Sequence, residues 1–239
     1  MSTDITIDPP LGEMPLTETV IARIRRNASA HADKLALVCG AQRVTWGAFD
    51  QRTNAVANLL IGIGVCKGSN VAILSANSIP YAELFIGILK AGACVTPLSS
   101  MASSEALKKM LVDCGAKAIF VAEQYAPLVD GFIADLPLRR FSIDFEHSDY
   151  AEFETAVRAA NSTDPDIPLA MSDAFNLIYS SGTTGTPKGI LHNHQMRAAQ
   201  MERVSPNGYD DNARTLISTP LYSNTTIVSF IPTLFGGST

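Results

Sequence analysis

The stretch VAILSANSIPYAELFIGILKAGACVTPL (Val71–Leu98) determines the expected fold. It begins with Val71–Ala76, an apolar run of strand length, followed by Asn77 and Ser78, a polar pair that can cap a helix. The apolar positions of the next segment (81, 84, 85, 88 and 89) recur at helical spacing and form one buried face. Ala93–Leu98 is a second apolar run. The order strand, helix, strand predicts a parallel pair of strands joined by a helical crossover.

The same pattern extends in both directions along the chain. Toward the C-terminus, apolar residues at 107, 110, 111 and 114 predict another helix, and Ala118–Ala122 predicts a third buried strand. Toward the N-terminus, Leu35–Cys39 and Gln42–Thr45 predict a hairpin. A helix is expected after it, with Thr45 as the N-terminal cap. Strands that are apolar throughout are typical of a parallel sheet covered by helices on both faces, so the sequence predicts a doubly wound α/β fold.

Residues 161–168 (NSTDPDIP) are the strongest candidate for a linker, because the two prolines and the Asp and Ser residues favour turns. We therefore expect three parts. Residues 1–40 would be an N-terminal extension with a helix and the first strand, and residues 41–165 the first α/β subdomain. Residues 166–239 would be the start of a second α/β subdomain, incomplete in this chain, which carries a glycine-rich loop.

The composition is that of a globular protein and excludes several classes. The 239 residues are 46% hydrophobic and 17% charged with a net charge of −5, so nucleic-acid binding is not expected. The opening residues, MSTDITIDPPLGEMP, lack the basic start and apolar run of a secretory signal. The apolar run Leu84–Leu89 is too short to span a membrane. Because the cysteines (Cys39, Cys66, Cys94 and Cys114) are widely spaced, we expect reduced, mostly buried thiols in a cytoplasmic protein.

The segment YSSGTTGTPKG (Tyr179–Gly189) has the composition of an anion-binding loop. Glycines allow the backbone to turn so that several N–H groups converge, and such concavities bind anions. Hydroxyl groups add donors, and Lys188 adds a positive charge. The candidate phosphate-binding residues are Ser180, Ser181, Gly182, Thr183, Thr184, Gly185, Thr186 and Lys188. A connecting loop without a ligand remains the alternative. A P-loop kinase or GTPase is disfavoured, because Pro187 precedes the lysine and Gly189 follows it, unlike the Walker A pattern.

The longer string YSSGTTGTPKGILHNH resembles the phosphate-loop signature of the adenylate-forming superfamily, which includes acyl- and aryl-CoA ligases, luciferases and peptide-synthetase adenylation domains. Three other segments support the resemblance. Thr45–Leu74 is similar to the family's first helix and first parallel strand, and Leu84–Ser100 to a Lys-Ala-Gly motif of the family. The final stretch, STPLYSNTTIVSFIPTLFGGST, resembles the segment beside the acyl pocket.

This resemblance implies a two-step reaction. A carboxylate attacks the α-phosphate of ATP and gives an acyl-adenylate and pyrophosphate, and a thiol, usually that of coenzyme A, then takes the acyl group. The substrates would be a fatty or aromatic acid, ATP with Mg²⁺, and coenzyme A. The loop from Ser181 to Lys188 would orient the β- and γ-phosphates. Lys188 would have a supporting role, because the family's main catalytic lysine lies in a C-terminal domain.

The segment Tyr222, Ser223, Asn224 and Thr225 matches the part of the family that lines the acyl tunnel. Here the chain departs from the common pattern, which has a histidine directly after the aromatic residue, where this chain has Ser223. The departure points to a different substrate class. A simple turn before a helix at Ile227–Leu234 is the alternative interpretation.

His192 and His194 are expected to alternate onto one face of the strand after the loop. Because no third ligand lies nearby in the sequence, we expect structural histidines with satisfied hydrogen bonds and no metal site. The second of them matches the family's histidine after the loop.

The family's other active-site segments have no match in this chain. We therefore expect the 239 residues to be the N-terminal part of a longer acyl-CoA ligase and to be inactive alone. Two alternatives remain open. The longer enzyme could load a carrier-protein thiol, as a fatty-acyl-AMP ligase or an adenylation domain does. The chain could also act as a nonenzymatic nucleotide-binding module or form homo-oligomers through an exposed apolar surface.

Overall fold

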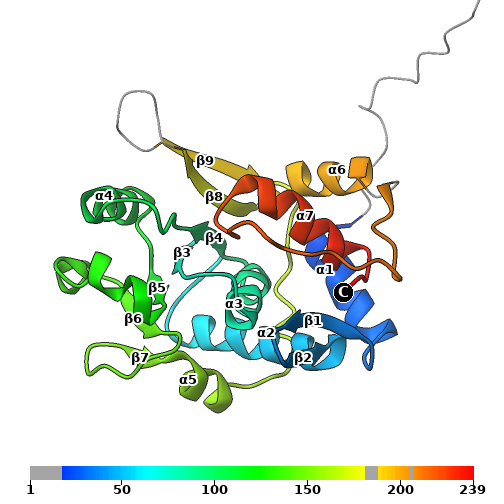
Figure 1. The fold of residues 1–239 in the computed structure, drawn as a ribbon, viewed down its shortest axis with the longest axis horizontal. Helices are drawn as coiled ribbons and strands as arrows, with labels where there is room; N and C mark the ends of the chain where they lie inside the picture. The colour runs from blue at the N-terminus through cyan, green and yellow to red at the C-terminus, as the bar shows by residue number, and fades with distance from the viewer. Residues whose placement is uncertain (1–17, 181–187, 205–206) are drawn as a thin grey trace, which may run out of the picture.

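The computed structural model describes residues 18–180, 188–204 and 207–239, which form a seven-stranded sheet, a separate two-stranded sheet and surrounding helices (Figure 1). The strands of the large sheet lie in the order β7-β6-β5-β3-β4-β8-β9. The strands are β1 (Leu35–Cys39), β2 (Gln42–Thr45), β3 (Asn70–Leu74), β4 (Cys94–Pro97), β5 (Ala118–Val121), β6 (Arg139–Ser142), β7 (Ala151–Glu152), β8 (Ala174–Ser180) and β9 (Lys188–Asn193).

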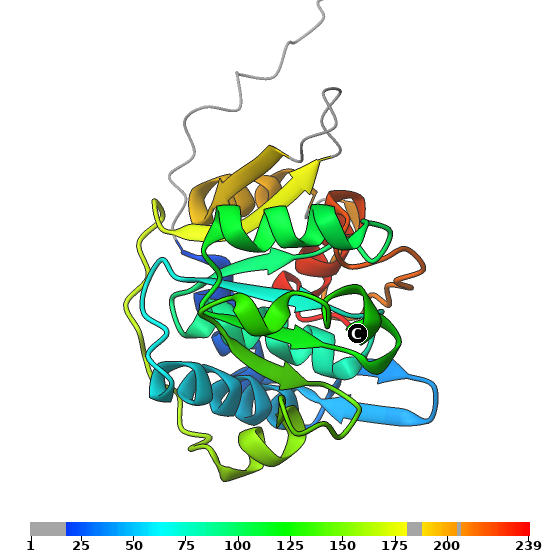
Figure 2. The same cartoon turned by 90° about the vertical axis from the view of Figure 1, so that its left-hand side faces the viewer.

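Helices cover both faces of the large sheet. The helices are α1 (Val20–Ala30), α2 (Trp46–Gly62), α3 (Ile79–Lys90), α4 (Ser104–Cys114), α5 (Phe153–Ala159), α6 (His194–Val204) and α7 (Asn224–Phe235), with short 3₁₀ turns at Glu123–Leu128 and Ile133–Asp135. Figure 1 shows α3 and α4 on opposite sides of the central strands, and Figure 2 views the sheet from the side of α4.

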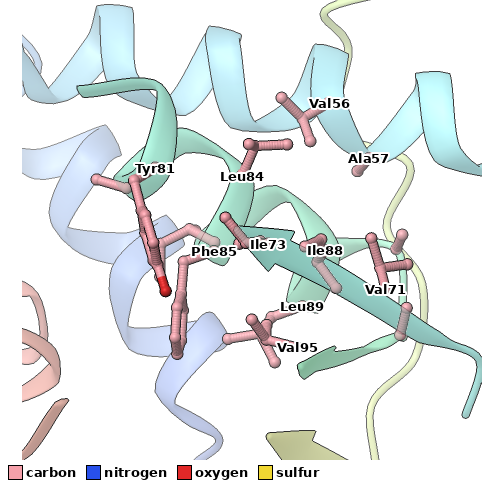
Figure 3. Packing of buried hydrophobic residues seen from close by; sticks show 14 of the residues in the cluster. Val56, Ala57, Val71, Ile73, Tyr81, Leu84, Phe85, Ile88, Leu89 and Val95 are labelled. Carbon is pink, nitrogen blue, oxygen red and sulfur yellow. The ribbon is translucent and has the colours of Figure 1, made fainter. Parts of the chain in front are cut away.

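Strand β3 explains why both faces must be covered. Val71 and Ile73 point to the core cluster that contains α1, α2, α3 and α7, whereas Ala72 and Leu74 point to the cluster under α4. Successive side chains of a strand point to opposite faces, so a strand with four successive apolar residues (Val71–Leu74) needs two cores. Figure 3 shows the first of these clusters, in which residues of α2, α3, β3 and β4 pack together.

The expected α/β fold and its local signals are confirmed. Strand β3 pairs in parallel with both β4 and β5, and β1 pairs antiparallel with β2. The side chain of Thr45 accepts a hydrogen bond from Ala48 N at the start of α2. Ser78 caps α3 in the same way by accepting from Tyr81 N. Helices of the two connections lie on opposite faces, so the sheet is doubly wound.

Helices α2 and α3 pack at very short range. A Cβ placed on Gly87 would lie 2.5 Å from Val56 Cβ, so only glycine fits there without rearrangement. At the end of α3, the fully buried Lys90 donates from Nζ to Asp50 Oδ1 (2.6 Å) and Asn54 Oδ1 (2.7 Å) of α2. These two hydrogen bonds link α3 to α2 through a polar contact inside an otherwise apolar interface.

The prediction of mostly buried cysteines was wrong for half of them. All four thiols are free, but Cys39 and Cys66 are exposed, and only Cys94 and Cys114 are buried. Cys39 lies in the two-stranded β1–β2 sheet, where one face is open to water, and Cys66 lies in the connection after α2.

The predicted division near residue 165 remains a prediction. Strands on both sides of that position belong to one sheet, because β8 pairs in parallel with β4, and β9 pairs antiparallel with β8. Over the part of the chain that the structure describes, no helix has the length and apolarity that crossing a bilayer requires. The cytoplasmic location also remains a prediction.

Candidate functional site

The carboxyl ends of β3, β4 and β8 lie at one edge of the sheet, because these strands are parallel neighbours. In open α/β sheets, ligands bind outside this edge. Asn77, which follows β3, donates from Nδ2 to Thr219 O (2.8 Å) and accepts from Leu221 N (2.8 Å). These two hydrogen bonds hold the segment before Tyr222 at the edge where β8 ends. The segment before Tyr222 and the carboxyl end of β8 thus lie at the same edge of the sheet.

Strands β8 and β9 form the two arms of the candidate phosphate loop. They pair antiparallel, with Ser180 opposite Lys188 and Tyr179 opposite Gly189. Ser180 is half-buried and Lys188 is exposed. Six of the predicted phosphate-binding residues (Ser181, Gly182, Thr183, Thr184, Gly185 and Thr186) lie outside the described residues. The structure thus places the two ends of the loop opposite each other at the carboxyl edge, and the phosphate-binding roles remain predictions.

Tyr179 anchors the β8 arm to the neighbouring helix. Its hydroxyl donates to Asp113 Oδ2 at 2.6 Å and lies 3.2 Å from Met110 O, both on α4. Burial and the bond to Asp113 raise the pKa of the Tyr179 phenol, which therefore stays protonated as a donor. Across the ladder, a Cβ on Gly189 would lie 3.3 Å from Tyr179 Cε1, so the glycine leaves room for the ring. Sequence reasoning gave no role to this aromatic–glycine pair.

A buried arginine, Arg197 of α6, connects the hairpin to α7. Its side chain donates from Nε to Asn176 Oδ1, from Nη1 to Gln200 Oε1 and from Nη2 to Asn224 Oδ1, each at 2.9 Å. Burial lowers the pKa of Arg197 to about 10, which still leaves it charged at neutral pH. Sequence reasoning missed this cluster, and the only signal for it was a polar Asn176 within the otherwise apolar strand β8.

The histidines do not share a strand face as expected. Strand β9 ends at Asn193, whose Oδ1 accepts from Met196 N and so supports a helix that starts at His194. His192 Nδ1 lies 3.5 Å from Asn176 Nδ2, whereas the buried His194 packs edge-on against Phe175. His194 Nδ1 has no hydrogen-bond partner within the described ranges, and the expectation of a satisfied histidine remains a prediction for this residue.

The predicted acid-binding residues lie at the start of α7. Tyr222 and Ser223 are half-buried, and Asn224 and Thr225 are exposed. The helix begins at Asn224, three residues before the predicted start, and continues to Phe235. Of these four residues, the structure brings Asn224 into contact with the buried arginine cluster. Their role toward a substrate remains a prediction.

Metal-binding groups do not gather in the described part of the chain. No group of three or more His, Cys, Asp or Glu side chains that could hold a metal ion occurs there. The donors of this edge are hydroxyls, amides and the cationic side chains of Lys188 and Arg197, which are groups that suit anions and oxygen acceptors.

Comparison with known proteins shows matches along almost the whole chain. The model of the AMP-binding enzyme family matches residues 24–239. The long-chain-fatty-acid–CoA ligase FadD13 of Mycobacterium tuberculosis is 29% identical over 153 residues, covering 64% of this chain and 30% of that protein. Surfactin synthase subunit 1 of Bacillus subtilis is 29% identical over 186 residues, covering 76% of this chain and 5% of that protein. The chain thus spans less than a third of these curated relatives.

Solved structures show the same fold. The anthranilate CoA ligase AuaEII in complex with anthranoyl-AMP superposes with a TM-score of 0.86 at 24% identity, covering 97% of this chain and 46% of that chain. The N-terminal domain of FACL13 from Mycobacterium tuberculosis superposes with a TM-score of 0.78 at 23% identity, covering 93% of this chain and 56% of that chain.

Proposed function

Because this chain belongs to the AMP-binding enzyme family, we propose that it forms the N-terminal part of an ATP-dependent ligase that joins a carboxylic acid to coenzyme A through an acyl-adenylate. The acid would be a fatty or aromatic acid, in agreement with the names of the CoA ligases to which the chain is similar. The superposition on an N-terminal domain supports the placement within the longer enzyme.

The observation that carries the proposal is the position of the β8–β9 hairpin. Its two ends, Ser180 and Lys188, pair at the carboxyl edge of the sheet, and Asn77 holds the segment before Tyr222 at the same edge. A phosphate-binding loop and an acid-binding segment would therefore face one space. Adenylation needs this arrangement, because the carboxylate oxygen must meet the α-phosphorus in line.

In the first step, the acid's oxygen forms a bond to the α-phosphorus, and the bond to pyrophosphate breaks. In the second step, a thiolate forms the thioester and AMP leaves. We assign to Ser180, Lys188 and the loop between them the binding of the β- and γ-phosphates, whose negative charge grows on the leaving group. Mg²⁺ would accompany the phosphates of ATP, and no described residue is assigned as its ligand.

A second candidate differs only in the thiol. Similarity to surfactin synthase subunits favours an enzyme that transfers the acyl group to a carrier-protein thiol. Consumption of the acyl-adenylate by coenzyme A in the full-length protein supports the first candidate. Consumption by a carrier protein alone supports the second.

The test measures carboxylate-dependent pyrophosphate release by the full-length protein with a panel of fatty and aromatic acids. In the Lys188→Ala and Thr184→Ala variants we expect kcat/KM for ATP to fall by about tenfold or more, as when a charge-assisted hydrogen bond is lost. Lys109→Ala, which removes an exposed lysine of α4, is the matched control. Unchanged adenylation in both loop variants would overturn the assignment.

The 239-residue chain alone should release no pyrophosphate, and clear turnover would contradict this expectation. Calorimetric titration of the same chain with ATP and Mg²⁺ tests the nonenzymatic alternative. The absence of heat at millimolar nucleotide would exclude a nucleotide-binding module.

A further inference from the structure

The cluster around Arg197 balances a buried positive charge in an uncommon way. The side chain is 2% exposed, and its three side-chain hydrogen bonds go to the amide oxygens of Asn176, Gln200 and Asn224. Within the described ranges, no carboxylate forms an ion pair with it. Buried charges are normally paired, because burial of an unpaired ion is costly.

The guanidinium fixes the orientation of the amides around it. Arginine can only donate hydrogen bonds, so each amide must present its oxygen to the guanidinium and direct its NH₂ group elsewhere. The NH₂ group of Asn176 faces His192 Nδ1 at 3.5 Å. The NH₂ group of Asn224 belongs to an exposed residue and is directed away from Arg197. Arg197 therefore leaves the NH₂ group of this exposed residue available as a hydrogen-bond donor.

Asn224 lies within the segment to which the proposed function assigns the acid. It is the first residue of α7, and its neighbours Ser223 and Thr225 are also polar. The side chain of Ser223 makes no capping hydrogen bond to the helix. A plain alkyl chain packed here would remove these groups from water without supplying acceptors, which costs free energy for each unpaired donor.

We propose that Arg197 is a positioning residue that holds the amide N–H groups of Asn224 toward the acid, and that the site therefore selects carboxylic acids carrying a second oxygen acceptor over unsubstituted alkanoates of equal length. This inference rests on the proposed function. We expect acids with an anionic second acceptor, such as dicarboxylic acids, to bind most tightly, because the second carboxylate also balances the charge of Arg197.

The kinetic test compares hexanoate, its ω-hydroxy derivative and hexanedioate, with butanoate and octanoate series alongside, in the full-length protein. We expect the best oxygenated acid to exceed its alkanoate about tenfold in kcat/KM. In Arg197→Met and Asn224→Leu, KM for the oxygenated acids should rise about tenfold. In Asn224→Leu, KM for the alkanoates should fall, because the alkyl chain then no longer covers an unpaired donor. Arg203→Met, an exposed arginine on the same helix, is the matched control.

Two results would overturn the inference. One is a wild-type preference for alkanoates, and the other is a proportional loss for every acid in the two variants, which indicates a purely structural role. Asn224→Leu keeps the test valid if Arg197→Met fails to fold, because Asn224 is exposed and Arg197 keeps its hydrogen bonds to Asn176 and Gln200.

A spectroscopic measurement separates this inference from the proposed function. If the full-length protein adenylates no acid, the proposed function fails, and NMR of the Asn224 side-chain NH₂ in the 239-residue chain decides the inference. A shift of this resonance with hexanedioate, absent with hexanoate and abolished by Arg197→Met, supports it. Equal shifts, or no shift with either acid, overturn it.

Discussion

Two buried cations, Lys90 in α3 and Arg197 in α6, differ in how the chain balances their charge. Lys90 pairs with the carboxylate of Asp50 and an amide of Asn54, whereas Arg197 contacts three neutral amides. Burial lowers the pKa of both groups, and for Lys90 the charge of Asp50 opposes that effect. The lysine is thus satisfied within the core, and the arginine retains an attraction for anions.

The two cations also occupy different places relative to the ligand edge. Helix α3 starts near the carboxyl end of β3 and ends before the amino end of β4, so Lys90 lies at the edge opposite the candidate site. Arg197 contacts the first residue of α7, beside the segment that Asn77 holds. Under the proposed function, the cation in the core is paired with a carboxylate, whereas the cation beside the acid-binding segment keeps its charge for interaction with a ligand.

The largest expected effect comes from breaking the paired cation. Lys90→Met leaves Asp50 and Asn54 without their buried donor and should lower the free energy of unfolding by about 3 kcal/mol, the lower end for a broken buried pair, because Asp50 is partly exposed to water. The additional change Asp50→Leu should restore part of that loss, because it removes the unpaired charge. Denaturant unfolding of the 239-residue chain measures both. A double variant no more stable than Lys90→Met would contradict the argument, and Lys109→Met, an exposed lysine, should behave as wild type.

The second-largest expected effect is a loss of stability at low pH that is caused by the buried side chain of His194. Burial of the side chain is the main reason why the pKa of His194 is lowered to about 4. The charge of Asp173 opposes this shift, and the charge of Lys67 adds to it. The unfolded chain, with a histidine pKa of about 6.5, binds more protons than the folded chain between these values. Stability is therefore lost as the pH falls from about 6.5 toward 4, by at most roughly 3 kcal/mol from this group.

Comparison with His194→Leu isolates that contribution, because titration of the carboxylates is common to both proteins. The difference in unfolding free energy should move in favour of the variant as the pH falls through this window and stay constant above about pH 7. A difference independent of pH would show that the pKa of His194 is the same in the folded and the unfolded chain, which contradicts the prediction.

Local signals made the centre of the fold predictable. The apolar runs around β3 and β4 and the caps Thr45 and Ser78 depend on residues within a few positions of one another, so the sequence alone reveals them. The placement of β8 beside β4 depends on a pairing across about 80 positions, such as Val95 with Asn176, which no local pattern encodes.

The site was less predictable for the same reason. Arg197 reaches Asn176 and Asn224 across 21 and 27 positions, so the contacts on which its proposed positioning role rests form only with the tertiary fold. His194 was assigned to the strand because alternation continued through it, although Asn193 ends the strand and supports the following helix. The loop between Ser180 and Lys188 lies outside the described residues, so its binding roles rest on the family resemblance.

The smallest expected effects are changes in stability when alanine replaces a glycine, Gly87 in the core or Gly189 at the candidate site. In Gly87→Ala the new Cβ meets Val56 Cβ and Cγ1 at 2.5 Å and Thr53 O at 3.0 Å. The branched Val56 has little rotamer freedom in a helix, and the other neighbour is backbone, so neither can move easily. Alanine gains about 1 kcal/mol in helix propensity, but overpacking should exceed it and leave a net loss of about 1–3 kcal/mol.

Gly189→Ala is the matched change at the site. Its Cβ would meet Leu177 Cδ1 at 3.0 Å, which is the end of a half-buried side chain that can shift slightly, and Tyr179 Cε1 at 3.3 Å, where a displacement of a few tenths of an ångström suffices. Alanine also restricts the unfolded chain, which favours folding by about 0.4–1 kcal/mol. The two terms should nearly cancel, so the unfolding free energy stays within about 1 kcal/mol of wild type. An equal loss in both variants would mean that the β8–β9 hairpin is packed as rigidly as the α2–α3 interface, and the expected difference between these two regions would be wrong.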